Sequence, residues 1–150
     1  MNAAFDGNGW VPEQAQTPAV APVKRRRNRA SAKKAGASFE RLVADYLNTE
    51  LGDDRIDRRV KNGRNDRGDI AGVRTVRGAR VVIEAKNTNR VELGTWIREA
   101  EIEAGNDDSQ YPVIVHKRTG KGDPAEQWVT MTLDTFARLL LGGADEETFE

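Results

Sequence analysis

The chain has 150 residues, 37% hydrophobic and 32% charged, which predicts one soluble domain with a modest core. It contains no cysteine, which excludes a disulfide framework and a thiolate zinc site. No apolar run approaches the length of a membrane span, and no apolar signal-peptide core follows the N-terminus. We therefore expect a cytoplasmic protein.

The net charge of zero conceals strongly segregated charge. Residues 24–34 carry seven positive charges and no acid, and residues 55–80 carry nine Arg and Lys against three acids. Residues 92–108 carry six acids against one arginine. Such segregation creates local potentials that the total hides. The two basic segments predict a polyanionic partner.

The first 35 residues are predicted to form a disordered arm. They hold all but two of the five prolines and show no periodic apolar pattern. The basic run 24–34 closes this arm, either as a solvated tail or as a nucleic-acid-binding arm. In the second case the phosphate contacts would come from Lys24, Arg25, Arg26, Arg27, Arg29, Lys33 and Lys34. The chain ends in an acidic tail, residues 143–150.

The folded domain is expected over residues 36–142 and opens with a helix. Apolar residues recur at helical spacing from Phe39 to Leu51, with Ser38 as the expected N-cap and Gly52 as the stop. Glu40 follows Phe39 and lies about 100° further round the helix. It therefore sits on the flank of the apolar stripe, where it can lean over the sheet that the helix covers.

Three strands are predicted next, around residues 58–61, 69–73 and 79–86, with residues 74–78 joining the last two as a hairpin. Side chains alternate between the two faces of a strand. In the third strand Val81, Ile83 and Ala85 thus share one face, whereas Glu84 and Lys86 emerge together on the other.

A second helix is expected over residues 93–104, a strand over 111–117, another strand over 127–132 and a closing helix over 133–141, capped by Asp134. The element order is α-β-β-β-α-β-β-α. This order predicts an α/β protein with a mixed sheet.

Acidic side chains on short apolar strands are costly unless something compensates their charge. Mg²⁺ prefers oxygen ligands, so Asp69 and Glu84 could share one such ion, with the backbone carbonyl of Ala85 as a third ligand. Lys86 would lie about 7 Å further along the strand, on the same face. A metal and an ammonium so placed could activate water and stabilise charge on a phosphate, which suits phosphodiester cleavage.

The motif also resembles a known superfamily. An acid-x-Lys triplet is expected about once by chance in such a chain, but Gly68-Asp69-Ile70 followed by Ile83-Glu84-Ala85-Lys86 resembles the PD-(D/E)xK nuclease motif. Gly68 stands at the position of the motif's proline. The segment Lys34-Ala-Gly-Ala-Ser-Phe-Glu40-Arg41-Leu42-Val43 is similar to the first helix of archaeal-type Holliday junction resolvases, and the resemblance spans residues 33–140.

The resemblance implies a restriction-endonuclease-like core and a Mg²⁺-dependent endonuclease, for which Mn²⁺ can substitute. It implies a homodimer that acts on branched DNA in recombination or repair, as in similar phage enzymes, which would work in the host cytoplasm. By position Asp69, Glu84 and Glu40 would be metal-site acids, with Glu40 acting through a water molecule, and Lys86 the catalytic lysine. DNA contacts would come from Arg58, Arg59, Lys61, Arg64, Arg67, Lys117, Arg118 and Lys121.

Other interpretations stay open from the sequence. Glu84 and Lys86 could form a salt bridge at a strand end, Asp69 could be a turn residue, and Glu40 could favour the helix N-terminus. His116, the only histidine, could be packed rather than functional. The alternative functions are a nuclease acting on linear or flap DNA, and a non-catalytic DNA-binding module on the same fold.

Overall fold

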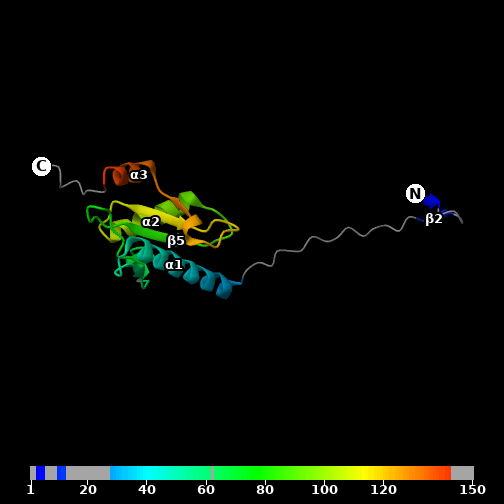
Figure 1. Ribbon diagram of the computed structural model, residues 1–150, viewed down its shortest axis with the longest axis horizontal. Helices are drawn as coiled ribbons and strands as arrows, with labels where there is room; N and C mark the ends of the chain where they lie inside the picture. Colours follow the sequence, from blue (N-terminus) through cyan, green and yellow to red (C-terminus); the bar gives the residue numbers. More distant parts are fainter. Residues whose placement is uncertain (1–2, 6–9, 13–27, 62, 143–150) are drawn as a thin grey trace.

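A computed structural model describes residues 3–5, 10–12, 28–61 and 63–142 of the chain (Figure 1). Strands β1 (Ala3–Phe5) and β2 (Trp10–Pro12) pair with each other in an antiparallel two-stranded sheet. The other strands and the α-helices are α1 (Arg29–Leu51), β3 (Asp57–Arg58), β4 (Ile70–Ala71), β5 (Val82–Lys86), α2 (Leu93–Asn106), β6 (Pro112–His116), β7 (Trp128–Thr130) and α3 (Leu133–Leu140), and two short 3-10 helices are η1 (Gly63–Asn65) and η2 (Pro124–Glu126). None of the described helices is both long and apolar enough to cross a membrane.

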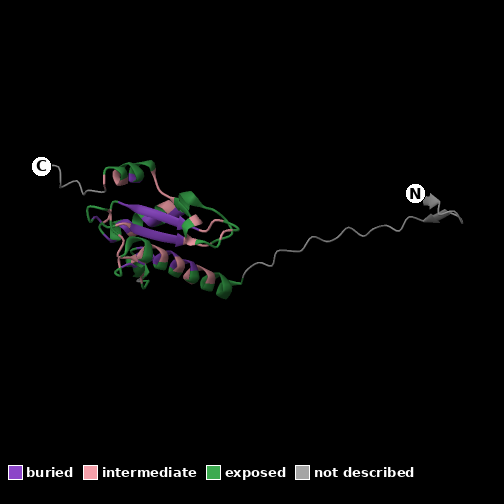
Figure 2. Ribbon diagram, in the orientation of Figure 1, coloured by how far each residue is buried: buried purple, intermediate pink, exposed green. Residues whose placement is uncertain are grey.

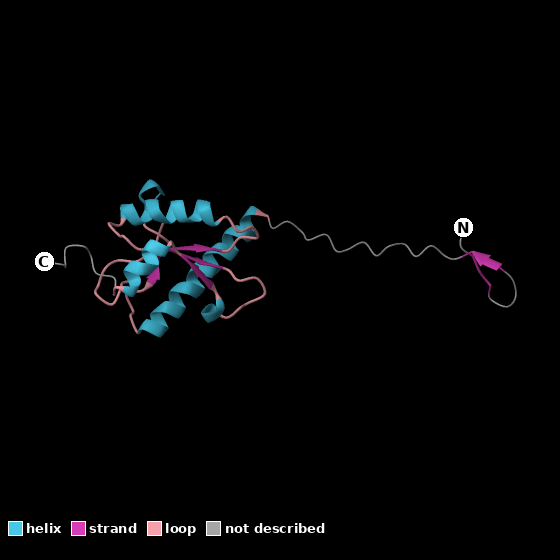
Figure 3. Cartoon of the chain, turned by 90° about the horizontal axis from the view of Figure 1, so that it is seen from above, coloured by secondary structure: helices cyan, strands magenta, loops and turns pink. Residues whose placement is uncertain are grey.

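A five-stranded mixed sheet organises the domain, in the order β3-β4-β5-β6-β7. The central strands β5 and β6 run parallel, and every other neighbouring pair is antiparallel. A parallel pair needs a crossover connection, and α2 supplies it. Helices α1 and α2 cover opposite faces of the sheet (Figures 1 and 3). The predicted mixed α/β class is confirmed.

The helix α1 begins at Arg29, so the prediction of a disordered arm up to residue 35, with an N-cap at Ser38, is wrong for this segment. Asn28 is the N-cap, because its side-chain oxygen accepts a hydrogen bond from the backbone N–H of Ser31 at 2.8 Å. Residues 29–35 are alanines, basic residues and one serine, mostly strong helix formers. They are largely exposed, and an exposed helix leaves no apolar period in the sequence. Gly52 ends α1 as predicted.

Regular structure also occurs earlier in the predicted arm, in β1 and β2. Four of the basic residues proposed for DNA binding lie outside the described residues: Lys24, Arg25, Arg26 and Arg27. The acidic tail, residues 143–150, also lies outside them. Arg29, Lys33 and Lys34 are exposed on the first turns of α1.

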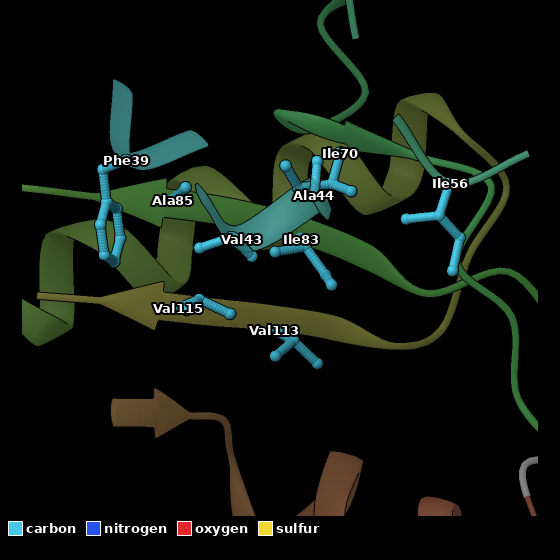
Figure 4. Packing of buried hydrophobic residues seen from close by; sticks show 9 residues of the cluster. All are labelled: Phe39, Val43, Ala44, Ile56, Ile70, Ile83, Ala85, Val113 and Val115. Atoms are coloured by element: carbon cyan, nitrogen blue, oxygen red, sulfur yellow. The ribbon is translucent and has the colours of Figure 1, made fainter. Parts of the chain in front are cut away.

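The main core lies between α1 and the sheet (Figures 2 and 4). Phe39, Val43 and Ala44 of α1 pack against β-sheet residues that include Ile83 and Ala85. On the opposite face, α2 packs through Trp96 and Ala100 against Ile114, and burying one large aliphatic side chain contributes about 1.5–3 kcal/mol. The predicted alternation in β5 is confirmed, because Ile83 and Ala85 face α1, whereas Glu84 and Lys86 contact residues of α2.

Strands β4 and β5 are shorter than the predicted runs 69–73 and 79–86. Beyond them the pairing continues through an isolated bridge, Arg74 with Arg80, and a hydrogen bond from the Val81 N–H to the Val73 carbonyl at 3.0 Å. The predicted hairpin is present, because Thr75 N–H donates to the Ala79 carbonyl at 2.8 Å. At the other end of the chain α3 is capped by Thr132 rather than Asp134, since the Thr132 hydroxyl accepts from the Thr135 N–H.

Candidate active site

The register between β4 and β5 brings Asp69 beside Glu84. Ile70 pairs with Ile83, and the Asp69 N–H donates to the Ile83 carbonyl at 2.8 Å. The Asp69 Oδ2 then accepts the backbone N–H of Ala85 at 2.9 Å. The Asp69 carboxylate thus takes the place of a backbone carbonyl of β4 as the acceptor for the Ala85 N–H. Both acids are removed from solvent, with 2% of Asp69 and 6% of Glu84 exposed.

Gly68 has a conformation that proline cannot adopt. Its φ is +88°, and a Cβ atom built on it would lie 2.9 Å from the Ile83 carbonyl oxygen. Proline fixes φ near −65°. Glycine is therefore required at the motif's proline position, because the turn at Gly68 approaches β5 closely. This close approach places Asp69 against β5.

Glu40 of α1 reaches the same region from the helix that covers the sheet. It is buried, and its Oε2 accepts hydrogen bonds from Arg58 Nε at 3.0 Å and Nη2 at 2.5 Å. Lys61 links Glu40 with Asp69, because its Nζ lies 2.9 Å from Asp69 Oδ1 and 4.0 Å from Glu40 Oε1. Burial acts to lower the pKa of Lys61, but the hydrogen bond to Asp69 and the charges of Asp69, Glu84 and Glu40 outweigh it and raise the pKa. Lys61 is therefore a cation held among three carboxylates.

Lys86 is the second cation of this cluster. Its Nζ lies 2.7 Å from Glu84 Oε1 and 2.7 Å from Glu99 Oε2 on α2. Only 17% of its side chain is exposed. Burial acts to lower the pKa of Lys86. The hydrogen bonds to Glu84 and Glu99 outweigh burial, so the pKa of Lys86 is raised above its ordinary value.

Glu103 of α2 is a member that the sequence analysis missed. Burial, the hydrogen bond to Glu84 and that residue's charge raise the pKa of Glu103 to about 8. Burial and the charge of Asp69 likewise raise the pKa of Glu84. The Oε2 of Glu103 is buried, with no hydrogen-bond partner among the described residues. The available signal was the spacing of Glu99 and Glu103, four residues apart on one helix face within the acidic run 92–108.

The donor chemistry of this cluster fits a hard divalent cation. Four carboxylates, of Glu40, Asp69, Glu84 and Glu103, supply oxygen ligands of the kind Mg²⁺ prefers. Burial and neighbouring carboxylates raise the pKa of both Glu84 and Glu103, so a bound cation would stabilise their ionised forms. As they stand, no three acid or histidine side chains of the described residues are grouped to hold one ion. Lys61 lies between Glu40 and Asp69, and 58% of its side chain is exposed.

A groove of about 800 Å³ leads to Glu40 along α1 and β3. Its lining carries five basic residues against two acids, Glu40 and Asp57: the basic ones are Lys33, Arg41, Arg58, Arg59 and Lys61. A positively charged groove of this kind suits a nucleic-acid backbone. Four of these residues were among the predicted DNA contacts: Lys33, Arg58, Arg59 and Lys61.

The remaining predicted residues lie elsewhere. Arg64 and Arg67 are exposed between β3 and β4. Lys117 donates to the Lys121 carbonyl, Lys121 pairs with Glu126 at 2.9 Å, and Arg118 stacks over Trp128 at 4.5 Å. Lys117, Arg118 and Lys121 therefore contact residues of the segment between β6 and β7 and of β7 itself.

His116 pairs with Lys86 across the parallel strands β5 and β6. It is buried, its Nε2 lies 2.9 Å from the Thr130 hydroxyl, and its ring centre is 5.5 Å from that of Trp96. Burial lowers its pKa. These contacts describe a packed, neutral histidine.

Comparisons with protein-family models, with curated proteins and with solved structures find no match to this chain.

Proposed function

We propose that this protein is a Mg²⁺-dependent, structure-specific DNA endonuclease on a restriction-endonuclease-like core, and that its substrate is the four-way Holliday junction. One observation carries the proposal: Asp69 and Glu84 lie side by side on neighbouring strands, with Lys86 on the same face as Glu84. Burying two acids and a lysine together costs free energy. A structural salt bridge would need only one acid and one base, so the second acid is better explained by a bound metal ion.

In the proposed enzyme Asp69 and Glu84 would hold the metal ion, together with the carbonyl of Ala85 and with Glu40 through a water molecule. When bound, Mg²⁺ supplies charge neutralisation at the scissile phosphate and a water of lowered pKa. Lys86 keeps its charge because two carboxylates hold it, and it serves to orient the attacking water or to stabilise charge on the phosphate. With the metal bound, Lys61, which is 58% exposed, would pair with the DNA backbone in place of Glu40 and Asp69.

The basic groove supports DNA as the substrate. It places Arg58 and Lys61 directly beside the proposed metal ligands, so a strand bound there would bring a phosphate to the acids. Contacts of this kind position the strand without reading its sequence. The exposed Lys33 and Lys34 on α1 would extend the same electrostatic track.

The exposed face of α3 supports the proposed homodimer. Leu133, Phe136 and Leu140 recur at helical spacing, and 81% of Leu133 and 72% of Leu140 are exposed. A row of apolar side chains on one helix face is typical of a protein interface. Two copies related by a twofold axis would present two active sites, which suits paired nicks in opposing strands of a junction.

Cleavage of a labelled four-way junction with Mg²⁺ tests the proposal, alongside linear duplex, flap and single-stranded DNA. We expect preferential junction cutting by the wild type, and at least a hundredfold loss in Lys86→Met and Glu84→Gln. Glu101→Gln, on the exposed side of α2, is the matched control and should cut normally. Equal cutting of linear duplex and junction would refute the junction assignment in favour of another nuclease of this type.

One observation favours a second candidate, a non-catalytic DNA-binding module. Arg58 and Lys61 already neutralise Glu40 and Asp69, which a purely structural ion network would also require. Calorimetry with Mn²⁺ separates the two functions. Binding that Asp69→Asn and Glu84→Gln abolish supports the enzyme, whereas the absence of metal binding by the wild type supports the module.

A further inference from the structure

A second charged pocket lies at the C-terminal end of α2, near the start of β5. Its volume is about 210 Å³, and four arginines contribute to its lining: Arg59, Arg67, Arg74 and Arg80. Asp107, the C-cap residue of α2, is the single acid in the lining. The proposed metal ligands Glu40, Asp69 and Glu84 do not line this pocket.

Asp107 compensates only part of the positive charge of the arginines around it. It is buried, and its contacts with Arg59 are long, at 3.4 Å to Oδ1 and 3.5 Å to Oδ2. Arg67 and Arg80 lie 3.8 Å from the same Oδ1. Ion pairs in which the guanidinium is fully engaged have N–O distances of about 2.7–2.9 Å. Three guanidinium groups therefore share one carboxylate, and the pocket keeps an excess of positive charge.

One of the four lining arginines also carries a buried donor without a partner among the described residues. The Nε of Arg59 is buried and has no acceptor among the described residues. Buried polar groups in folded proteins are almost always hydrogen-bonded, and none of the described residues supplies an acceptor for this N–H, which favours a bound ligand as its partner. The guanidinium fork matches the geometry of phosphate oxygens, which can accept from two N–H groups at once.

We propose that this arginine pocket binds a phosphate group of a nucleic-acid strand. The volume suits one phosphate with a few waters, because a water molecule occupies about 30 Å³. Asp107 follows Glu103 by one helical turn, about 6 Å along α2, so a strand whose phosphate sits in the pocket passes close to the carboxylate cluster. The choice of a nucleic acid as the source rests on the proposed function, whereas phosphate binding itself does not.

The pocket would fix the strand next to the cutting site. A phosphate held by Arg59 and its neighbours gives the substrate a fixed register relative to Glu84 and Lys86, as phosphate contacts do in other DNA complexes. Asp107 competes with the phosphate for the guanidinium groups. It holds them in place until the phosphate takes over as their partner.

The test follows the arginine Nε–H signals by NMR in EDTA, without divalent metal. The probes are inorganic phosphate, an oligonucleotide with a 5′-phosphate, and the same oligonucleotide without it. We expect saturable shifts of the Arg67 and Arg80 Nε signals with the oligonucleotides, because these two arginines line the pocket but not the groove that Arg59 also lines. Arg67→Gln, which removes a half-exposed arginine, should weaken this binding about tenfold. Asp107→Asn should strengthen it, because the competing charge is gone, and Arg98→Gln on the exposed face of α2 should leave it unchanged.

Each outcome decides the assignment. A response to both oligonucleotides identifies an internal phosphodiester as the ligand, and a response confined to the 5′-phosphorylated one identifies a strand end. A shift with inorganic phosphate alone would overturn the nucleic-acid assignment, and no saturable shift with any probe would overturn the pocket itself. Lys86→Met separates the pocket proposal from the nuclease proposal. If this variant binds phosphate through the pocket but does not cut DNA, both proposals are supported. If the wild type binds through the pocket but never cuts DNA, only the nuclease proposal is contradicted.

Discussion

Replacing Glu103 by glutamine should change how the stability of the folded protein depends on pH. The pKa of Glu103 is raised from 4.5 to about 8 by burial and by its hydrogen bond with Glu84. The folded state therefore holds a proton that the unfolded chain releases above about pH 4.5. The free energy of unfolding should accordingly decrease as the pH rises from 4.5 to 8.

The size of the effect follows from the same values. A fully buried, isolated group with this displacement would contribute about 5 kcal/mol, at 1.36 kcal/mol per pH unit. Glu103 is only half-buried, and solvent screens its charge, so we expect about 1–2 kcal/mol. Glutamine has the same shape and no charge. Glu103→Gln should thus match the wild type at pH 5 and exceed its stability by about 1–2 kcal/mol at pH 8.5.

Urea denaturation followed by circular dichroism, at several pH values from 5 to 9 in EDTA, measures this difference. Glu101→Gln is the matched control, because Glu101 is exposed on the same helix, and its profile should run parallel to that of the wild type. If the profile of Glu103→Gln also ran parallel to the wild type, the close carboxyl pair of Glu84 and Glu103 would be refuted.

Three further predictions concern the cluster, the turn before it and the dimer. Lys61→Gln should bind Mn²⁺ about tenfold more tightly in calorimetry, because a competing cation is removed from between Glu40 and Asp69; unchanged affinity would mean that Lys61 does not occupy the metal position. Gly68→Pro should lower the midpoint of urea denaturation, since φ of +88° is closed to proline, and a variant as stable as the wild type would contradict the turn geometry. Phe136→Glu should convert a dimer to a monomer in sedimentation without loss of circular dichroism, whereas an unchanged mass would remove α3 from the interface.

The helices and strands that bury an apolar face could be predicted from the sequence. Segments without a buried apolar face could not be predicted. Phe39 and Val43 marked the buried part of α1, but its first turns project beyond the sheet and carry no apolar period. The faces of β5 were predictable because alternation is a property of any strand. Strand lengths were overestimated, since apolar residues mark burial rather than pairing.

The candidate site divides in the same way. Asp69, Glu84 and Lys86 stood out because they are charged residues in apolar surroundings. Glu103 did not, because it is one acid among six in residues 92–108, and only packing distinguishes the one that meets Glu84. The arginine pocket depends on residues from separate loops and on the end of α2, so it exists only once the chain has folded.

The bond from the Ala85 N–H to the Asp69 side chain makes that amide a natural reporter. β5 is the middle strand of the sheet, and amides of central strands exchange with solvent only on global unfolding. At Ala85, however, the acceptor is a carboxylate that can turn away, rather than a fixed carbonyl. Its exchange rate with deuterium therefore follows the conformation of a single side chain, and a cation that draws Asp69 toward itself would change that rate while the neighbouring amides of β5 stayed protected.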